Sequence, residues 1–389
     1  MAPSAILTPA QDMCSACPLI GRLGSHHAAS HGAESAARRT EGIAAHSREP
    51  DCFWNRKMTG ASGYVGGEAL YQIAQLPQPH QIRCLVRDVK KVQPIIDAFP
   101  SAEVVKGDLD DSALIEKEAQ AADVVFHLAS TKHESSSKAI AAGLSHAERK
   151  SPGYWIQMSG ASIFSIPEIK ANSYGQASDR VYDDLEDAKE ILELIRSNPS
   201  RIVDNLVLSQ DPSKIRTALI PGPMIYGTGH GAINKRSIQG PEVTKYALQN
   251  NQPYIVGKGD SAWSNVHVHD LGKLFSLLLQ AAVEKREGLW NENGIFLPEN
   301  GSMSFGEVSR RIAQAAHERK LIKSDDVKSV SSEEANQIMP HGAVLLGTNA
   351  KLKSSRARRD LRWKPSAMSL AEDIPLMVKA EAERLKNHL

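Results

Sequence analysis

Three glycines spaced three residues apart, Gly60, Gly63 and Gly66, are the feature that most constrains how this chain can fold. A helix-like run, 68–74, follows them at once. Glycine lets the backbone turn tightly, and the free N–H groups at the start of a helix attract an anion such as a pyrophosphate. The same spacing occurs in glycine-rich surface loops. It therefore predicts an anion site only where a strand precedes it and a βαβ unit follows.

The segment after this helix reads as the second strand of such a unit. Ile82, Cys84 and Val86 are apolar at a period of two, which predicts a strand over 82–87. It ends at Arg87, about twenty residues past the glycines, where dinucleotide-binding domains contact the adenosine ribose. A carboxylate there binds the ribose hydroxyls of NAD, whereas an arginine suits the 2′-phosphate of NADP. A solvated charge at a strand end is the alternative, and the neighbouring Asp88 keeps it open.

Helices and strands alternate along the next part of the chain. Further strands are predicted at 103–106, 123–129, 154–158 and 214–220. One helix, Asp179 to Ile195, is strongly amphipathic, because its apolar residues recur every three or four positions. Such alternation predicts right-handed crossovers and a parallel sheet. The predicted fold class is therefore α/β, with a doubly wound parallel Rossmann sheet.

Several segments resemble motifs of the extended short-chain dehydrogenase/reductases, the NAD(P)-dependent epimerase/dehydratase family. Residues 59–66 resemble the family's T-G-x-x-G-x-x-G motif. The other resemblances are 106–111 to its G-D-L segment, 123–129 to its fourth strand, 220–227 to its R-P-x-x-I-Y-G segment without the arginine, and 265–271 to its V-H-V-x-D helix start. The match runs from about residue 58 to 385 in family order, as in an atypical, fungal-type branch. It is specific for the fold and much less so for the reaction.

The resemblance implies a Rossmann domain that binds NADP, or alternatively NAD, and a smaller C-terminal substrate-binding lobe. The residues that it carries over to cofactor binding come from the glycine turn and the ends of the second, third and fourth strands: Gly60, Ser62, Gly63, Tyr64, Val65, Arg87, Asp108, Leu109, Ala129 and Ser130.

The predicted domain boundaries are a disordered extension over 1–52, the Rossmann domain over 53–222 plus 266–289, and the lobe over 223–265 plus 290–389. The segment directly before the glycines departs from the family. Asn55, Arg56 and Lys57 would lie in the centre of a parallel sheet, where strands are buried on both faces. Either this strand is short and imperfect, or the N-terminal part of the sequence is not the natural one.

Composition excludes several classes of protein. The formal net charge is +1 over 389 residues, so no global field favours nucleic acid or an acidic membrane surface. No run approaches the roughly 18 apolar residues of a membrane helix. Four cysteines make no disulfide framework, so a reducing compartment is expected. We expect a soluble, cytoplasmic protein that acts on a small molecule, with neither nucleic acid nor membrane as a partner. The oligomeric state stays open.

A metal site is not predicted. Two cysteines and three histidines near the N-terminus are the residue types that bind zinc: Cys14, Cys17, His26, His27 and His31. No second matched pair accompanies them.

The catalytic residues of the family are only partly present. The family uses a serine after the fifth strand and a Tyr-x-x-x-Lys pair on the following helix, where the lysine lowers the pKa of the tyrosine phenol. Ser159 stands where that serine is expected, with a turn-capping serine as the alternative. The helix over 201–208 contains neither tyrosine nor lysine. The one Tyr-x-x-x-Lys of the chain, Tyr254 to Lys258, lies beyond the sixth strand.

Other side chains are candidates for the missing proton donor and for substrate contacts. Tyr174 is the candidate hydroxyl, and Lys132 and His133 follow the fourth strand at the cofactor edge. Each of them equally suits a solvated surface. Tyr226 and Trp263 are predicted to contact substrate, although Trp263 equally suits the packed core of the lobe.

Two functions are compatible with these motifs. The first is an NAD(P)-dependent oxidoreductase or epimerase/dehydratase that acts on a small metabolite, for example in secondary metabolism. The second is a catalytically silent, NADP-sensing regulator, resembling nitrogen-metabolite-repressor proteins that keep the fold and lose the Tyr–Lys pair. The substrate does not follow from the fold.

Overall fold

Six parallel strands form the central sheet in the computed structural model, which describes residues 55–77 and 82–387. The predicted extension over 1–52 and the Cys14–His31 cluster lie outside the described residues. The strand order is β3-β2-β1-β4-β5-β7, the doubly wound order of dinucleotide-binding domains, and it confirms the predicted fold. The strands are β1 Arg56–Thr59, β2 Ile82–Val86, β3 Ala102–Lys106, β4 Val124–His127, β5 Gly153–Gly160 and β7 Ile215–Gly222.

The segment before the glycine turn is a strand in the middle of this sheet. β1 is 4 residues long, is buried throughout, and pairs with β2 on one side and β4 on the other. Its charged residues are compensated by neighbouring carboxylates. Lys57 Nζ lies 2.8 Å from Glu118 Oε2. Burial lowers the pKa of Arg56 to about 10, against the opposing charge of Asp123. The strand is therefore short and imperfect, as the first of the two interpretations predicted.

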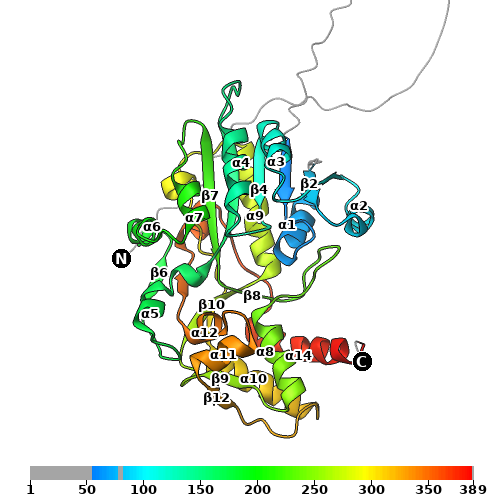
Figure 1. Cartoon of the computed structure of the whole chain (residues 1–389), viewed down its shortest axis with the longest axis vertical. Helices are drawn as coiled ribbons and strands as arrows, with labels where there is room; N and C mark the ends of the chain where they lie inside the picture. Colours follow the sequence, from blue (N-terminus) through cyan, green and yellow to red (C-terminus); the bar gives the residue numbers. More distant parts are fainter. Residues whose placement is uncertain (1–54, 78–81, 388–389) are drawn as a thin grey trace, which may run out of the picture. The chain divides into compact units, whose positions relative to one another are not determined.

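Helices cover both faces of the sheet. In Figure 1, α1 and α9 lie side by side, and they contact each other. Helices α3, α4, α6 and α7 pack on the other face, where α3 contacts α4 and α4 contacts α7. The bounds are α1 Tyr64–Ala74, α2 Val92–Ala98, α3 Ser112–Gln120, α4 Glu134–Leu144, α6 Ala188–Arg196, α7 Ile202–Leu208 and α9 Val268–Val283. Neighbouring residues of β4 belong to different hydrophobic clusters, one on each face of the sheet. Val125 packs with α3 and α4, and Val124 packs with α1 and α9.

Short strands and further helices, drawn in the lower part of Figure 1, complete the fold. Strands β8 and β10 pair in parallel and β11 pairs antiparallel to β10. The strands are β6 Val181–Asp183, β8 Met224–Tyr226, β9 Tyr254–Val256, β10 Ala262–His267, β11 Ser302–Ser304, β12 Lys328–Val330 and β13 Lys351–Lys353. The helices are α5 Ile166–Ala171, α8 Gln239–Asn250, α10 Phe305–Glu318, α11 Ser332–Ile338, α12 Gly342–Gly347, α13 Ser355–Asp360 and α14 Leu370–Lys386. None of the helices in 55–77 and 82–387 is both long and apolar enough to span a membrane.

The helix predicted over Asp179 to Ile195 is wrong in its first half. Residues 181–183 form β6, which pairs with β13, and α6 begins only at Ala188. Asp184 explains the difference, because its carboxylate accepts hydrogen bonds from the backbone N–H of Arg356 and of Leu297. These contacts with distant segments outweigh the local helical periodicity.

The Lys57–Glu118 ion pair makes a testable contribution to stability. Glu118→Ala leaves the buried Lys57 ammonium without its carboxylate, and we expect it to lower the free energy of unfolding by about 2 kcal/mol. The double variant Lys57→Met, Glu118→Leu replaces both charges with apolar groups. Arg83, which also pairs with Glu118, is 40% exposed and keeps Glu103 as a partner, so the double variant should remain within about 1 kcal/mol of wild type. Urea unfolding measures both values. A double variant as unstable as Glu118→Ala would contradict the explanation.

Candidate functional site

The turn between β1 and α1 requires its glycines. Gly60 has φ +85°, a left-handed conformation, and a Cβ on it would lie 2.7 Å from Leu128 C and from Ala129 N. A Cβ on Gly66 would lie 2.1 Å from Gly60 O. The turn therefore packs backbone against backbone, both within itself and against the end of β4.

The start of α1 is suited to an anion. Gly63, the N-cap residue, is extended and no side chain caps the helix, nor is there an acidic residue in its first turn. The backbone N–H groups around Tyr64 and Val65 thus point out of the helix end without a side-chain acceptor, where the helix dipole favours negative charge. These features fit the pyrophosphate of a dinucleotide.

A chain of hydrogen bonds, buried at Thr59 and His127 and exposed at Asp110, joins the strand ends around this turn. Thr59 Oγ1 lies 2.6 Å from His127 Nδ1, and His127 Nε2 lies 3.3 Å from Ser136 Oγ. Ser136 Oγ contacts His133 Nδ1 at 2.9 Å, and His133 Nε2 reaches Asp110 Oδ1 at 3.0 Å. Burial, assisted by His133, lowers the pKa of His127 to about 4, so His127 is neutral at pH 7. The chain fixes the ends of β1 and β4 and the loop after β3 relative to one another.

The other predicted cofactor residues follow the ends of β2, β3 and β4. The Arg87 side chain is 82% exposed, with Nη1 3.5 Å from Asp108 Oδ2, so its guanidinium remains available to a phosphate. Leu109 packs against the core cluster. Ala129 lies against Gly60, and the carbonyl oxygen of Ser130 accepts a hydrogen bond from Gln157 Nε2 at 3.1 Å.

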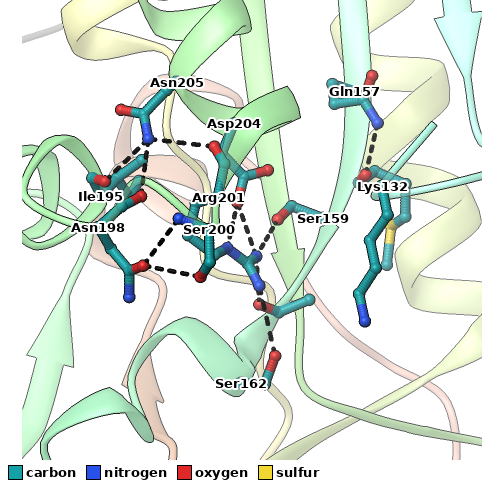
Figure 2. A network of polar contacts seen from close by, with 12 residues as sticks. Lys132, Gln157, Ser159, Ser162, Ile195, Asn198, Ser200, Arg201, Asp204 and Asn205 are labelled. Carbon is teal, nitrogen blue, oxygen red and sulfur yellow. Dashed lines mark hydrogen bonds and ion pairs between the residues drawn. The ribbon is translucent and has the colours of Figure 1, made fainter. Parts of the chain in front are cut away.

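Ser159, at the end of β5, is held by an arginine (Figure 2). Arg201 Nη2 donates to Ser159 Oγ at 2.9 Å and to the carbonyl oxygen of Gly160 at 3.2 Å. Arg201 Nε donates to Asp204 Oδ2 at 2.7 Å, and Nη2 lies 2.6 Å from the same oxygen. Burial raises the pKa of Asp204, while the charge of Arg201 and a hydrogen bond from Ser159 oppose that rise. Ser159, Arg201 and Asp204 thus form one polar cluster at the carboxyl end of the sheet.

Sequence reasoning missed Arg201 and Asp204. They lie at the start of α7, the helix before the last strand of the sheet, where the resemblance placed the Tyr-x-x-x-Lys pair. This helix contains neither the tyrosine nor the lysine that the family pattern predicts. The available signal was an Arg-x-x-Asp spacing, which puts both side chains on one face of a helix.

The structure does not bring Tyr174 to Ser159. Tyr174 packs against Gly347 at the end of α12, and none of the contacts found for the described residues joins it to Ser159. Tyr226 is buried, with its hydroxyl donating to Met368 O at 2.8 Å. Trp263 is buried against Phe305, as in the alternative of a packed core. Lys132 is exposed, and its ammonium makes none of the contacts drawn in Figure 2.

A second polar cluster fastens the segment after β8 to α1. The buried Glu68 accepts hydrogen bonds from the backbone N–H of His230 at 2.7 Å and from Gln72. Burial raises the pKa of Glu68, but hydrogen bonds from Gln72 and His230 outweigh it and bring it below the ordinary value. Glu68, His230 and His269 are close enough to share a metal ion. However, the rings of His230 and His269 stack at 4.0 Å, so their in-plane lone pairs do not converge. The hydrogen bond between Glu68 and His230 therefore joins α1 to the segment after β8, and we call this pair the clasp.

Comparison with known proteins gives the family. Residues 60–199 match a family model described as NAD(P)H-binding. The chain is 32% identical over 338 residues to the oxidase ucsJ of Acremonium sp, covering 84% of this chain and 97% of the relative. The chain belongs to the extended short-chain dehydrogenase/reductase family. It thus contains an NAD(P)-binding domain.

Two further proteins are similar to this chain over most of its length. It is 22% identical over 326 residues to the uncharacterised protein YLL056C of Saccharomyces cerevisiae, covering 82% of this chain and 96% of that protein. Its fold matches the dTDP-glucose 4,6-dehydratase DesIV of Streptomyces venezuelae, solved with NAD and TYD bound, at TM-score 0.60 and 15% identity. That match covers 85% of this chain and 97% of the DesIV chain.

The glycine turn predicts a graded response to added methyl groups. The Cβ of Gly66→Ala would lie 2.1 Å from Gly60 O, whereas that of Gly63→Ala would lie 3.1 Å from the same atom. Overpacking of about 3 kcal/mol should weaken NADPH binding about a hundredfold in Gly66→Ala, and less than about tenfold in Gly63→Ala. Fluorescence titration with NADPH, paired with thermal melting, measures this. Wild-type binding by Gly66→Ala would contradict the assignment of the turn.

The buried His127 predicts a pH-dependent stability. Its pKa is about 4 in the folded chain against the ordinary 6.5, so the unfolded state takes up the proton first as the pH falls. Stability is then unaffected above pH 6.5 and is lost by about 3 kcal/mol as the pH falls through 4. His127→Gln should remove one proton from this dependence, measured by urea unfolding from pH 7 to pH 4. Burial also lowers the pKa of His267 to about 4. His267 therefore still makes the free energy of unfolding depend on pH in the His127→Gln variant. An unchanged slope would contradict a neutral His127.

Proposed function

We propose that the protein is an NAD(P)-dependent oxidoreductase or epimerase/dehydratase that acts on a small metabolite, such as one of secondary metabolism. The observation that carries this proposal is the placement of two features at one edge of the sheet. The glycine turn follows β1, and the Ser159–Arg201 pair follows β5. Since β4 alone separates these strands, a dinucleotide bound at the turn has its reactive end in reach of Ser159.

The chain's own residues would bind and orient both reactants. The backbone N–H groups at the start of α1 would hold the pyrophosphate. When bound, the nicotinamide ring of the dinucleotide supplies or accepts a hydride. Arg201 would donate a hydrogen bond to the substrate oxygen next to the reacting carbon, beside Ser159, which positions the substrate and stabilises negative charge on that oxygen.

We further propose that NADP is the preferred dinucleotide. Arg87 follows β2, where the ribose is contacted, and its guanidinium is mostly exposed. Asp108 is 3.5 Å away and competes only weakly for it.

One observation favours a second candidate, the NADP-sensing regulator. The polar partners found for the Ser159 side chain within the described residues are Arg201 and Asp204, with neither tyrosine nor lysine among them. A protein without a proton donor at this position could bind a dinucleotide and transmit its presence through the clasp of Glu68 and His230.

Binding of NADPH and NADH tests the proposal. Wild-type protein should bind NADPH about tenfold more tightly than NADH, because a charge-assisted hydrogen bond contributes about 1.5 kcal/mol. Arg87→Glu should reverse this order, whereas Arg310→Glu, an equally drastic change on α10, should leave it unchanged. Absence of binding to either dinucleotide would end the proposal. Binding without oxidation of NADPH by any of a panel of aldehydes, ketones, enones and quinones would favour the sensor.

A further inference from the structure

We propose that the Ser159–Arg201–Asp204 cluster selects α,β-unsaturated carbonyl substrates, because Arg201 stabilises the enolate oxygen that forms when the double bond is reduced. This inference rests on the proposed function and specifies its substrate class. The N–H groups that Arg201 can donate decide which substrates the cluster suits.

Arg201 is fixed in place with one nitrogen largely unused. Nε and Nη2 bind Asp204, and Nη2 also donates to Ser159. Nη1 has only a 3.5 Å contact with Ser162 Oγ, a distance at which a hydrogen bond is weak. The Arg201 side chain is 14% exposed. A substrate oxygen that displaces the Ser162 contact would therefore receive an N–H donor from Nη1 and lie beside the Ser159 hydroxyl (Figure 2).

Arginine stabilises an anion but does not protonate it. A guanidinium does not lose its proton in a protein, whereas the phenol of the family's tyrosine does. Reduction of a simple ketone leaves an alkoxide, which is a base about as strong as hydroxide. Such a product needs a proton donor at its oxygen. The cluster supplies a guanidinium N–H donor, held in place by Asp204, so it suits an oxyanion that is stable without immediate protonation.

Reduction of a conjugated carbonyl yields such an oxyanion. The β-carbon of the substrate accepts a hydride and forms a new C–H bond. The π pair of the C=C bond shifts to the α-carbon–carbonyl bond, and the carbonyl π pair moves to oxygen as an enolate. Water then protonates the α-carbon, and the carbonyl forms again. In the balanced reaction, one enone, one NADPH or NADH and one proton are consumed. One saturated ketone and one oxidised dinucleotide are formed.

Asp204 is a positioning residue in this account. It binds Nε and Nη2 of Arg201 next to Ser159 and lies buried in α7. It keeps the guanidinium directed at the strand edge and makes no substrate contact itself. Asp204→Asn should therefore loosen Arg201 without removing its charge.

The first test compares a matched pair of substrates. Wild-type protein with NADPH should reduce 2-cyclohexenone to cyclohexanone and should reduce cyclohexanone itself at least about a hundredfold more slowly. Arg201→Gln should lower kcat/KM for 2-cyclohexenone by about 10²–10³, the loss typical of one oxyanion donor. Arg216→Gln is the control, because Arg216 also pairs with a carboxylate, that of Glu287, but lies at the opposite end of the same sheet.

The second test does not depend on turnover. p-Nitrophenol is a probe whose ionised form absorbs visible light, and a nearby positive charge lowers its pKa by about one unit or more. Bound p-nitrophenol should ionise at lower pH with wild type, Arg201→Lys and Arg216→Gln, and at its solution pH with Arg201→Gln. Thermal melting and NADPH titration show whether Arg201→Gln is folded. If Arg201→Gln is unfolded, the double variant Arg201→Gln, Asp204→Asn takes its place and is compared with wild type and Arg201→Lys.

The outcomes separate this inference from the proposed function. Failure to bind NADPH overturns both. NADPH binding with faster reduction of cyclohexanone than of 2-cyclohexenone, or with no turnover of either, overturns the inference alone. An equal p-nitrophenol pKa in the presence of wild type and a folded variant without Arg201 also overturns it.

Discussion

The close contact between the backbone of Gly60 and that of Gly66 is the constraint on which the rest of the structure depends. It folds β1 directly into α1 and brings the turn against Leu128 and Ala129 at the end of β4. Any side chain at either position would separate these segments. Because the turn is closed in this way, the first amides of α1 face the same edge of the sheet as Ser159, and a dinucleotide and a substrate can meet there.

Two polar networks hold the parts around this turn. The hydrogen-bonded chain from Thr59 through His127 to Asp110 fixes three strand ends, and the Glu68–His230 clasp holds the segment after β8 against α1. Each network has a buried residue at its centre, His127 in one and Glu68 in the other, and the polar groups named here have partners, so the networks specify one arrangement of the loops. Beside these networks, Arg201 at the start of α7 contacts Ser159, whereas the resemblance predicted a tyrosine and a lysine on this helix.

The sequence predicted the sheet and the glycine turn because both follow from local rules, namely alternation of apolar residues and the conformational freedom of glycine. Prediction from the sequence failed where contacts between distant segments determine the local structure. The periodicity around Val181 indicated a helix, yet pairing with β13 makes a strand. The charges of β1 argued against a central strand, and only the position of Glu118 on α3 shows how Lys57 is compensated. Arg201 was passed over because its role depends on Ser159, 42 residues earlier in the chain.

The most direct test of the account is a crystal structure of the protein with NADPH. The account predicts the pyrophosphate on the backbone N–H groups of Tyr64 and Val65, the 2′-phosphate beside Arg87, and the nicotinamide ring next to Ser159 and Arg201. A dinucleotide bound elsewhere, or bound at the glycine turn with its nicotinamide directed away from Arg201, would contradict it.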